Sequence, residues 1–299
     1  MTIWITGFNI SLDMVLQVEN IDKYGRTHVR EIKTIGSKGG NVFRALLSLA
    51  QHPHIITFTW GNSGKLIENM LYAISPSTLQ IHNHHFTATH DRESRINTIL
   101  LNNGKEELMS APNPSIDKNT AKSFIQSVAK VIKPDDHLVI TGSLPEGLEI
   151  VDMIPLIESV KENHIWIDLK GNHLIKAYNL APRAIFKLNH IESHDLTERG
   201  ILPDKLIVTS KDRVIANIDG QHTAVNIPPQ TPVVNTIGAG DVFMASLVYE
   251  RVIHGKPWEE TLKWASARAT ASTLELGVAI WQEEKAKEIY NSITIYQPS

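Results

Sequence analysis

The stretch Asn235-Thr236-Ile237-Gly238-Ala239-Gly240-Asp241 decides how the rest of the chain is interpreted. It precedes residues 242–253, where apolar side chains recur at the spacing of a helix. Two glycines at the start of a helix let backbone N–H groups approach an anion closely, and the helix dipole favours it. Asp241 would repel a bound phosphate unless it takes a proton from a hydroxyl that attacks that phosphate. The alternative is an ordinary glycine turn, with Asp241 as an acid in the first helical turn.

The composition is typical of a soluble, globular protein. The 299 residues are 42% hydrophobic and 20% charged, and the formal net charge is −3, so no nucleic-acid or membrane partner is expected. No apolar run is long enough to span a bilayer, and the N-terminus has no secretory signal. The absence of cysteine excludes disulfides, thiolate zinc sites and cysteine nucleophiles, and it fits a cytoplasmic protein.

Strand and helix patterns alternate along most of the chain. Strands are predicted at residues 3–9, 55–59, 79–82, 137–141, 165–169, 184–188 and 206–209, and helices at 42–50, 65–73, 120–131, 150–162, 242–253, 258–276 and 283–290. This order predicts an α/β fold, with a mostly parallel sheet and helices on both faces. Two β-rich pieces, at about 12–34 and 87–112, interrupt it and are expected to form a small lid. With no repeat or linker, residues 1–299 are predicted to be a single domain that carries this lid.

Polar side chains follow several predicted strands, and ligands of open α/β sheets bind at such strand ends. Asp13 could accept hydrogen bonds from two sugar hydroxyls, or could be a turn residue. In Gly36-Ser37-Lys38-Gly39-Gly40-Asn41, the glycines allow close backbone approach, and Lys38 could meet a phosphate. The alternative is a flexible loop in which Asn41 caps a helix. Ser143 could donate to a phosphate or belong to a simple turn.

Other candidates carry weaker signals. Asn189 and Glu192 supply oxygen atoms suited to magnesium bound through water, but they also fit a helix capping box, and both interpretations can hold together. Arg95 falls in the second lid piece, where the alternative is a solvated surface charge. Four histidines, for which a structural or surface role is favoured over a metal site, are His82, His84, His85 and His90.

The order of these motifs resembles that of the PfkB (ribokinase-like) carbohydrate kinases, from residue 3 to about residue 276. The motifs are Asn9-Ile10-Ser11-Leu12-Asp13, Gly36-Ser37-Lys38-Gly39-Gly40-Asn41-Val42, Ser94-Arg95-Ile96-Asn97, Gly142-Ser143-Leu144-Pro145, Lys187-Leu188-Asn189-His190-Ile191-Glu192 and residues 235–241. Within the family, the chain is most similar to the branch that phosphorylates hexose phosphates, such as 1-phosphofructokinase and tagatose-6-phosphate kinase. The resemblance implies an ATP-dependent kinase that uses Mg²⁺ and acts on fructose-1-phosphate, fructose-6-phosphate or tagatose-6-phosphate.

The resemblance also implies roles for single residues. Asp241 would be the general base, and an anion hole would be formed by the amides of Gly238, Ala239 and Gly240. Sugar hydroxyls would be held by Asp13, Gly39, Gly40 and Asn41. A phosphate already on the sugar would be met by Lys38, Arg95 and Ser143. Arg26 occupies the lid position from which a basic residue can reach a neighbouring subunit's substrate, and the family lid implies a homodimer.

The nucleotide side departs from the family pattern. The resemblance assigns the nucleotide and magnesium to Asn189 and Glu192, and it puts Asp168 near the phosphates. The family's glycine-rich nucleotide loop is replaced here by Thr209-Ser210-Lys211-Asp212-Arg213, so Thr209 and Lys211 are the candidates for nucleotide contact. Lys170 stands where a small residue is usual. Two alternatives therefore stay open: a kinase of an unphosphorylated sugar or nucleoside, and a sugar-phosphate-binding pseudokinase.

Overall fold

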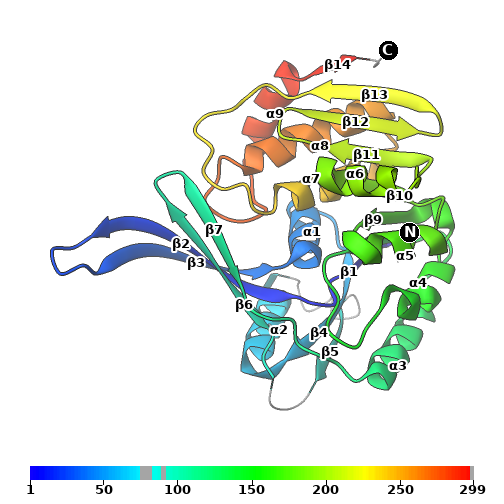
Figure 1. Ribbon diagram of the computed structural model, residues 1–299, viewed down its shortest axis with the longest axis horizontal. Coiled ribbons are helices and arrows are strands. Elements are labelled where there is room, and N and C mark those ends of the chain that lie inside the picture. The colour runs from blue at the N-terminus through cyan, green and yellow to red at the C-terminus, as the bar shows by residue number, and fades with distance from the viewer. Residues whose placement is uncertain (75–82, 89–91, 297–299) are drawn as a thin grey trace.

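The body of the molecule is one large sheet covered by helices on both faces (Figure 1). The computed structural model describes residues 1–74, 83–88 and 92–296. Within these residues the strand order is β14-β13-β12-β11-β10-β9-β8-β1-β4-β5. The strands are β1 (Ile3–Thr6), β4 (His54–Trp60), β5 (Asn83–Ala88), β8 (His137–Thr141), β9 (Ile165–Asp168), β10 (Ile185–Asn189), β11 (Lys205–Thr209), β12 (Arg213–Ile218), β13 (Gln221–Asn226) and β14 (Thr294–Tyr296). Pairing is parallel from β5 to β11 and antiparallel from β11 to β14, which confirms the predicted mostly parallel sheet.

The helices bury two apolar cores, one against each face of the sheet. One core includes α1 (Lys38–Ser48), α2 (Gly61–Ile74), α7 (Ala239–Val248), α8 (Trp258–Ser272) and α9 (Glu283–Ser292). The other includes α3 (Lys118–Ala129), α4 (Ile154–Glu158), α5 (Gly171–Leu180) and α6 (His190–Glu198). Fully buried side chains such as Phe43 and Leu247 each stabilise the fold by about 1.5–3 kcal/mol. In the described part of the chain, no helix has the length and apolar character needed to cross a membrane.

A smaller sheet projects from this body (Figure 1). Its order is β3-β2-β6-β7, with β2 (Ser11–Ile21), β3 (Thr27–Gly36), β6 (Arg95–Asn102) and β7 (Lys105–Ser110). The expected start of its second piece, at residue 87, is wrong, because β5 pairs in parallel with β4 in the large sheet. A strand-like pattern does not say which sheet a strand joins, so the sequence could not separate β5 from β6. The strand predicted at 79–82 lies outside the described residues.

Most helices differ by a few residues from their predicted bounds, and two of the differences have a clear physical reason. The helix predicted at 150–162 is broken into a 3₁₀ turn, Ile150–Met153, and the short helix α4, because Pro155 favours a fresh helix start. The helix predicted from residue 42 begins earlier, as α1, with Ser37 as its N-cap. Asn41 is therefore a first-turn residue of α1, and the alternative that made it the cap is wrong.

Gly39 lies where α1 meets the end of β1, and it generates a stability prediction. A Cβ atom there would stand 2.5 Å from the carbonyl oxygen of Thr6 and 2.6 Å from the Cα of Gly7. Because backbone atoms cannot move aside cheaply, Gly39→Ala should lower the free energy of unfolding by about 1–3 kcal/mol, measured by urea denaturation. Gly40→Ala is the matched control, since its Cβ would meet only side-chain atoms, of Ile35 at 3.1 Å and of Ile10 at 3.6 Å, and alanine favours the helix. Equal losses in the two variants would contradict this explanation.

Candidate active site

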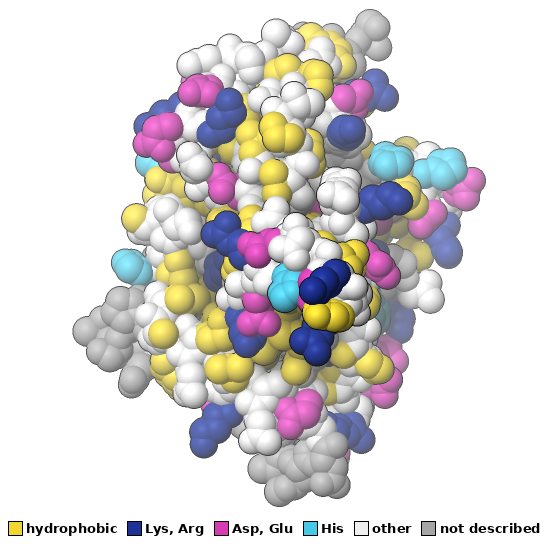
Figure 2. All heavy atoms as spheres, turned by 90° about the vertical axis from the view of Figure 1, so that its left-hand side faces the viewer, with side chains coloured by type: hydrophobic (Ala, Val, Ile, Leu, Met, Phe, Trp, Pro, Cys, Tyr) yellow, Lys and Arg dark blue, Asp and Glu magenta, His cyan; other side chains and the backbone are white. Residues whose placement is uncertain are grey.

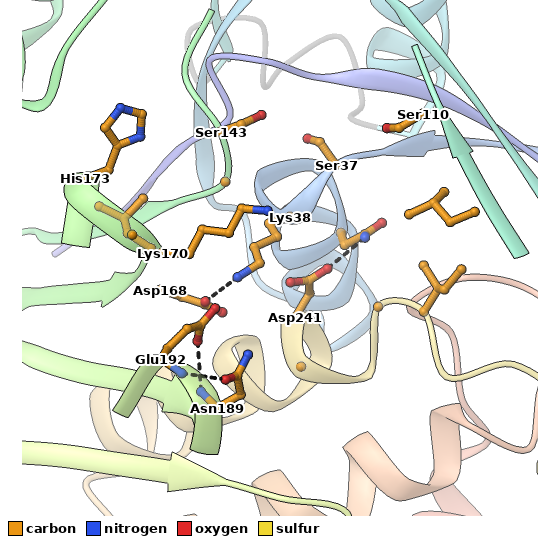
Figure 3. A pocket seen from close by; sticks show the side chains of 18 of the residues that line it. Ser37, Lys38, Ser110, Ser143, Asp168, Lys170, His173, Asn189, Glu192 and Asp241 are labelled. Atoms are coloured by element: carbon orange, nitrogen blue, oxygen red, sulfur yellow. Dashed lines mark hydrogen bonds and ion pairs between the residues drawn. The ribbon is translucent and has the colours of Figure 1, made fainter. Parts of the chain in front are cut away.

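A cleft of about 1140 Å³ opens at the carboxyl ends of β8 to β11, beneath β6 and β7 of the smaller sheet (Figure 3). This is the edge where open α/β sheets bind ligands, because strand ends and helix N-termini meet there. Most of the predicted site residues line it: Asp13, Lys38, Asn41, Arg95, Ser143, Asp168, Asn189, Glu192, Thr209, Gly238, Gly240 and Asp241. Residues that are far apart in the sequence are therefore brought into one cavity.

The start of α7 carries two glycines, and the backbone requires the first of them. Gly238 is the N-cap of α7 with φ +86°, and a Cβ atom there would stand 2.7 Å from Val278. At Gly240, the space that a Cβ would fill is 3.0 Å from Nζ of Lys187, so an anion near this amide also meets an ammonium group. The amide of Ala239 donates to the carbonyl of Thr236 at 3.3 Å, and Ala239 does not line the cleft. The helix start thus presents Gly238 and Gly240 to a ligand, but not Ala239.

Asp241 is a buried carboxylate that lies in the first turn of α7 and faces the cleft. Its Oδ2 accepts a hydrogen bond from Nδ2 of Asn41 at 2.8 Å (Figure 3). Among the described residues, no lysine or arginine forms an ion pair with it. Burial raises the pKa of Asp241 to about 6; Lys38 and the Asn41 bond oppose this effect, and the charge on Asp168 adds to it. Such a group can accept a proton near neutral pH.

Asp168 binds two lysines at the centre of the cleft. It is fully buried at the end of β9, and its carboxylate pairs with Nζ of Lys38 at 2.5 Å and with Nζ of Lys187 at 2.9 Å. Burial would raise the pKa of Asp168, but Lys187 and Lys38 outweigh it, so that pKa lies below its ordinary value. Lys187 was not among the predicted site residues. The signal that could have found it is a lysine within the otherwise apolar strand β10, since buried lysines need a partner.

Asn189 and Glu192 form a capping box at the start of α6. This was one of the two interpretations of the pair in the sequence. Oδ1 of Asn189 accepts from the amide of Glu192 at 2.9 Å, and Oε2 of Glu192 accepts from the amide of Asn189 at 2.9 Å. Both side chains also line the cleft, next to Asp195. Within the described residues, no group of three or more His, Cys, Asp or Glu side chains could hold a metal ion directly. The side chains of His82, His84, His85 and His90 lie outside the described part.

The connection between β11 and β12 is a tight turn in place of a glycine loop. The amide of Ser210 donates to the carbonyl of Arg213, and Oγ of Ser210 donates to Asp212, each at 2.9 Å. Thr209 lines the cleft at the end of β11, whereas Lys211 is exposed in the turn and does not. Of the two residues predicted to contact a nucleotide in this region, Thr209 thus lies in the cleft and Lys211 outside it.

The opposite end of the cleft holds a network of amides, hydroxyls and one arginine. Asp13 is buried and accepts from Nδ2 of Asn97 at 2.8 Å; burial raises the pKa of Asp13, although the bonds from Ser11 and Asn97 oppose this. Arg95 donates to the carbonyl of Asn9 at 3.3 Å, and Asn9 donates to Oγ of Ser143 at 3.0 Å. Asn97 lines the cleft but was not among the predicted site residues.

Five predicted residues do not line the cleft: Gly39, Gly40, Ala239, Arg26 and Lys211. Gly39 and Gly40 are buried in the first turn of α1, where they let the helix approach its neighbours. Arg26 is exposed at the tip of the β2–β3 hairpin, with its amide bound to Asp22. For the glycines, the sequence pattern is explained by packing and not by ligand contact.

Comparisons with known proteins agree with this geometry. Residues 183–285 match the model of the pfkB family carbohydrate kinases. The chain is 25% identical over 310 residues to the tagatose-6-phosphate kinase of Staphylococcus epidermidis, with 97% of each chain covered. It is 28% identical over 268 residues to the 1-phosphofructokinase of Borreliella burgdorferi, with 84% of each covered.

The fold is that of known phosphofructokinases. Phosphofructokinase-2 of Escherichia coli superposes with a TM-score of 0.82 at 18% identity, over 98% of this chain and 99% of that one. At this identity the likeness shows the fold alone. In sequence, residues 183–285 match the model of the PfkB family, and the chain is similar over most of its length to kinases that act on sugar phosphates.

Proposed function

We propose that this carbohydrate kinase transfers the γ-phosphoryl group of ATP to a hydroxyl of a hexose monophosphate. The observation that carries the proposal is the buried carboxylate of Asp241 at the N-terminus of α7, beside Gly238 and Gly240 in the same cleft. The names of the relatives, tagatose-6-phosphate kinase and 1-phosphofructokinase, support a phosphorylated sugar as the acceptor.

The proposed step uses Asp241 as the base. Its carboxylate takes the proton of the acceptor hydroxyl while that oxygen attacks the γ-phosphorus. The bond from the γ-phosphorus to the bridging oxygen breaks, and ADP leaves. The amides of Gly238 and Gly240 and the ammonium of Lys187 stabilise the charge on the transferring group, because they are fixed before the reaction begins.

The acceptor sugar lies against α1 and the smaller sheet in this proposal. Oδ1 of Asn41 and Nε of Arg95 are buried and have no hydrogen-bond partner among the described residues. A buried polar atom that is left unpaired costs about 1–3 kcal/mol, so a ligand that pairs with it gains affinity. Asn41 and Asp13 would bind sugar hydroxyls, and the phosphate of the sugar would be bound by Arg95, Ser143 and Lys38.

The nucleotide lies on the side of β10 and β11, near Asn189, Glu192 and Thr209. Asn189 Oδ1 and one oxygen of Glu192 already accept hydrogen bonds in the capping box. These side chains would therefore contact a magnesium ion through its bound water molecules, most of which Mg²⁺ keeps. When bound, Mg²⁺ would neutralise part of the charge on the phosphates. Because a tight turn follows Thr209, the parts of the nucleotide other than its phosphates would have few side-chain contacts in this region.

The smaller sheet acts as a lid over the cleft in this proposal. Glu106 of β7 accepts hydrogen bonds from the amide and the hydroxyl of Thr236, at 2.7 Å and 2.9 Å, and so ties the sheet to the turn before α7. The same sheet is proposed to pair with its copy in a homodimer, because it exposes the apolar side chains of Ile21, Val29 and Met109. Figure 2 views the molecule from this side, where charged side chains of both signs also gather.

A substrate panel tests the proposal. With Mg-ATP, ADP release should be fastest with fructose-1-phosphate, fructose-6-phosphate or tagatose-6-phosphate, and slower with free hexoses and nucleosides. Asp241→Asn should reduce kcat by at least the ~10²–10⁴-fold of general-base loss while still binding the sugar phosphate. If a free sugar or a nucleoside were turned over faster, the proposed hexose phosphate would not be the substrate. If Asp241→Asn kept full activity, Asp241 would not be the base.

The raised pKa of Asp241 predicts the acid limb of the pH profile. Since the ionised carboxylate is the base, kcat/KM should fall about tenfold per pH unit below pH ~6 and level off above it. The acceptor phosphate itself titrates near this pH, so the residual activity of Asp241→Asn supplies the reference profile. An identical acid limb in both proteins would assign the limb to the substrate.

The Glu106 contact predicts a role of the lid in binding. Glu106→Gln removes one acceptor oxygen and should raise the KM for the sugar phosphate about 3–10-fold, the value of a lost hydrogen bond. Glu107→Gln is the matched control, since Glu107 is the next residue of the strand and successive side chains of a strand point to opposite faces. Steady-state kinetics that showed the same KM for both variants would argue against closure by Glu106.

A further inference from the structure

Lys170 is a cation in the cleft to which the proposed reaction gives no task. It lies two residues beyond Asp168, the last residue of β9, and is the N-cap of α5, where its side chain makes no capping hydrogen bond. It lines the cleft together with Gly142 and Ser143. In Figure 3 its side chain extends from the start of α5 across the cavity toward Lys38, on the side of Ser143.

Lys170 has no acidic partner among the described residues, unlike its two neighbours. Lys38 and Lys187 are both paired with Asp168. Lys170 is exposed, and no acidic group in the described part of the chain forms an ion pair with it. A free ammonium group with three donors suits a phosphate oxygen.

The strand order indicates which of the two phosphate-bearing reactants Lys170 would contact. In the proposed reaction the nucleotide side is built from β10 and β11, and the acceptor side from β8, β1 and the smaller sheet. Lys170 follows β9, which lies between them in the sheet. Its side chain points toward Ser143 and not toward Asn189 or Glu192, so it faces the acceptor side (Figure 3).

We propose that Lys170 binds the phosphate group that the acceptor sugar already carries, together with Arg95 and Ser143. It thereby selects phosphorylated over free hexoses. This inference rests on the proposed kinase function, and it concerns a position where the family pattern has a small residue. Because the side chain is exposed, replacing it leaves the core intact.

The test compares Lys170→Met with Lys170→Arg and with Lys130→Met, which removes an exposed lysine at the end of α3. Lys170→Met should raise the KM for the preferred hexose phosphate about 10- to 100-fold, as expected for a lost charge-assisted hydrogen bond, and leave the KM for Mg-ATP nearly unchanged. Lys170→Arg should retain most of the affinity, and Lys130→Met should behave as the wild type. Calorimetry with fructose-1-phosphate, fructose-6-phosphate and tagatose-6-phosphate in the absence of nucleotide should show the same loss of affinity.

Each other outcome has a definite meaning. A rise in the KM for ATP without a change for the sugar phosphate would overturn the proposal in favour of a nucleotide contact, and unchanged constants for both would overturn it outright. If the wild type bound a hexose phosphate without turning it over, and Lys170→Met bound it weakly, the kinase function would fail while the assignment of Lys170 held. Failure of the wild type to bind any of the three hexose phosphates would overturn the assignment.

Discussion

The double ion pair of Asp168 with Lys38 and Lys187 determines the electrostatics of the whole cleft. It joins the end of β9 to the first turn of α1 and to β10, and it is largely buried. Because both ammonium groups are engaged by Asp168, neither forms an ion pair with Asp241. Burial can then raise the pKa of Asp241 to about 6 instead of being cancelled by a close cation. The lysine pair thus holds the pKa of Asp168 low, while the pKa of Asp241 is raised, as its proposed role as a base requires.

The strand order explains how the proposed sugar phosphate and nucleotide could be brought together in one cleft. Each parallel strand ends at the same edge of the sheet, and β11, β10, β9, β8 and β1 follow one another across it. Thr209, Asn189, Asp168 and Ser143 therefore stand in a row, with the lysine pair at the middle. In the proposed reaction the nucleotide lies at the Thr209 end of this row and the acceptor sugar at the Ser143 end, with the helix starts of α1 and α7 between them.

The sequence predicted those residues lining the cleft whose signal is local. The glycine turn before α7, Asp241, Asp13 and the capping box at Asn189 could be found because each has a short motif with a physical reason. Lys187 and Asn97 were missed because their importance comes from partners distant in the chain, Asp168 and Asp13.

The fold could be predicted in the same way, up to its long-range pairings. The alternation of strands and helices was sufficient for the large sheet. It could not show that β5 joins β4, or that the three residues of β14 extend the edge at β13. Gly39 and Gly40 show a related limit, since a glycine required for packing has the same sequence signal as one required for a ligand.

The parallel pairing of β2 with β6 has a consequence for how the protein is made. Ser11 lies opposite Arg95, and the strand β4, the helix α2 and the strand β5 come between them in the chain. The β2–β3 hairpin therefore leaves the ribosome long before its partner strand exists. Leu12 and Val15, which end in the same core as Ile99 and Leu101, stay uncovered during that interval. The apolar face of this hairpin therefore stays open to non-native contacts until β6 has been synthesised.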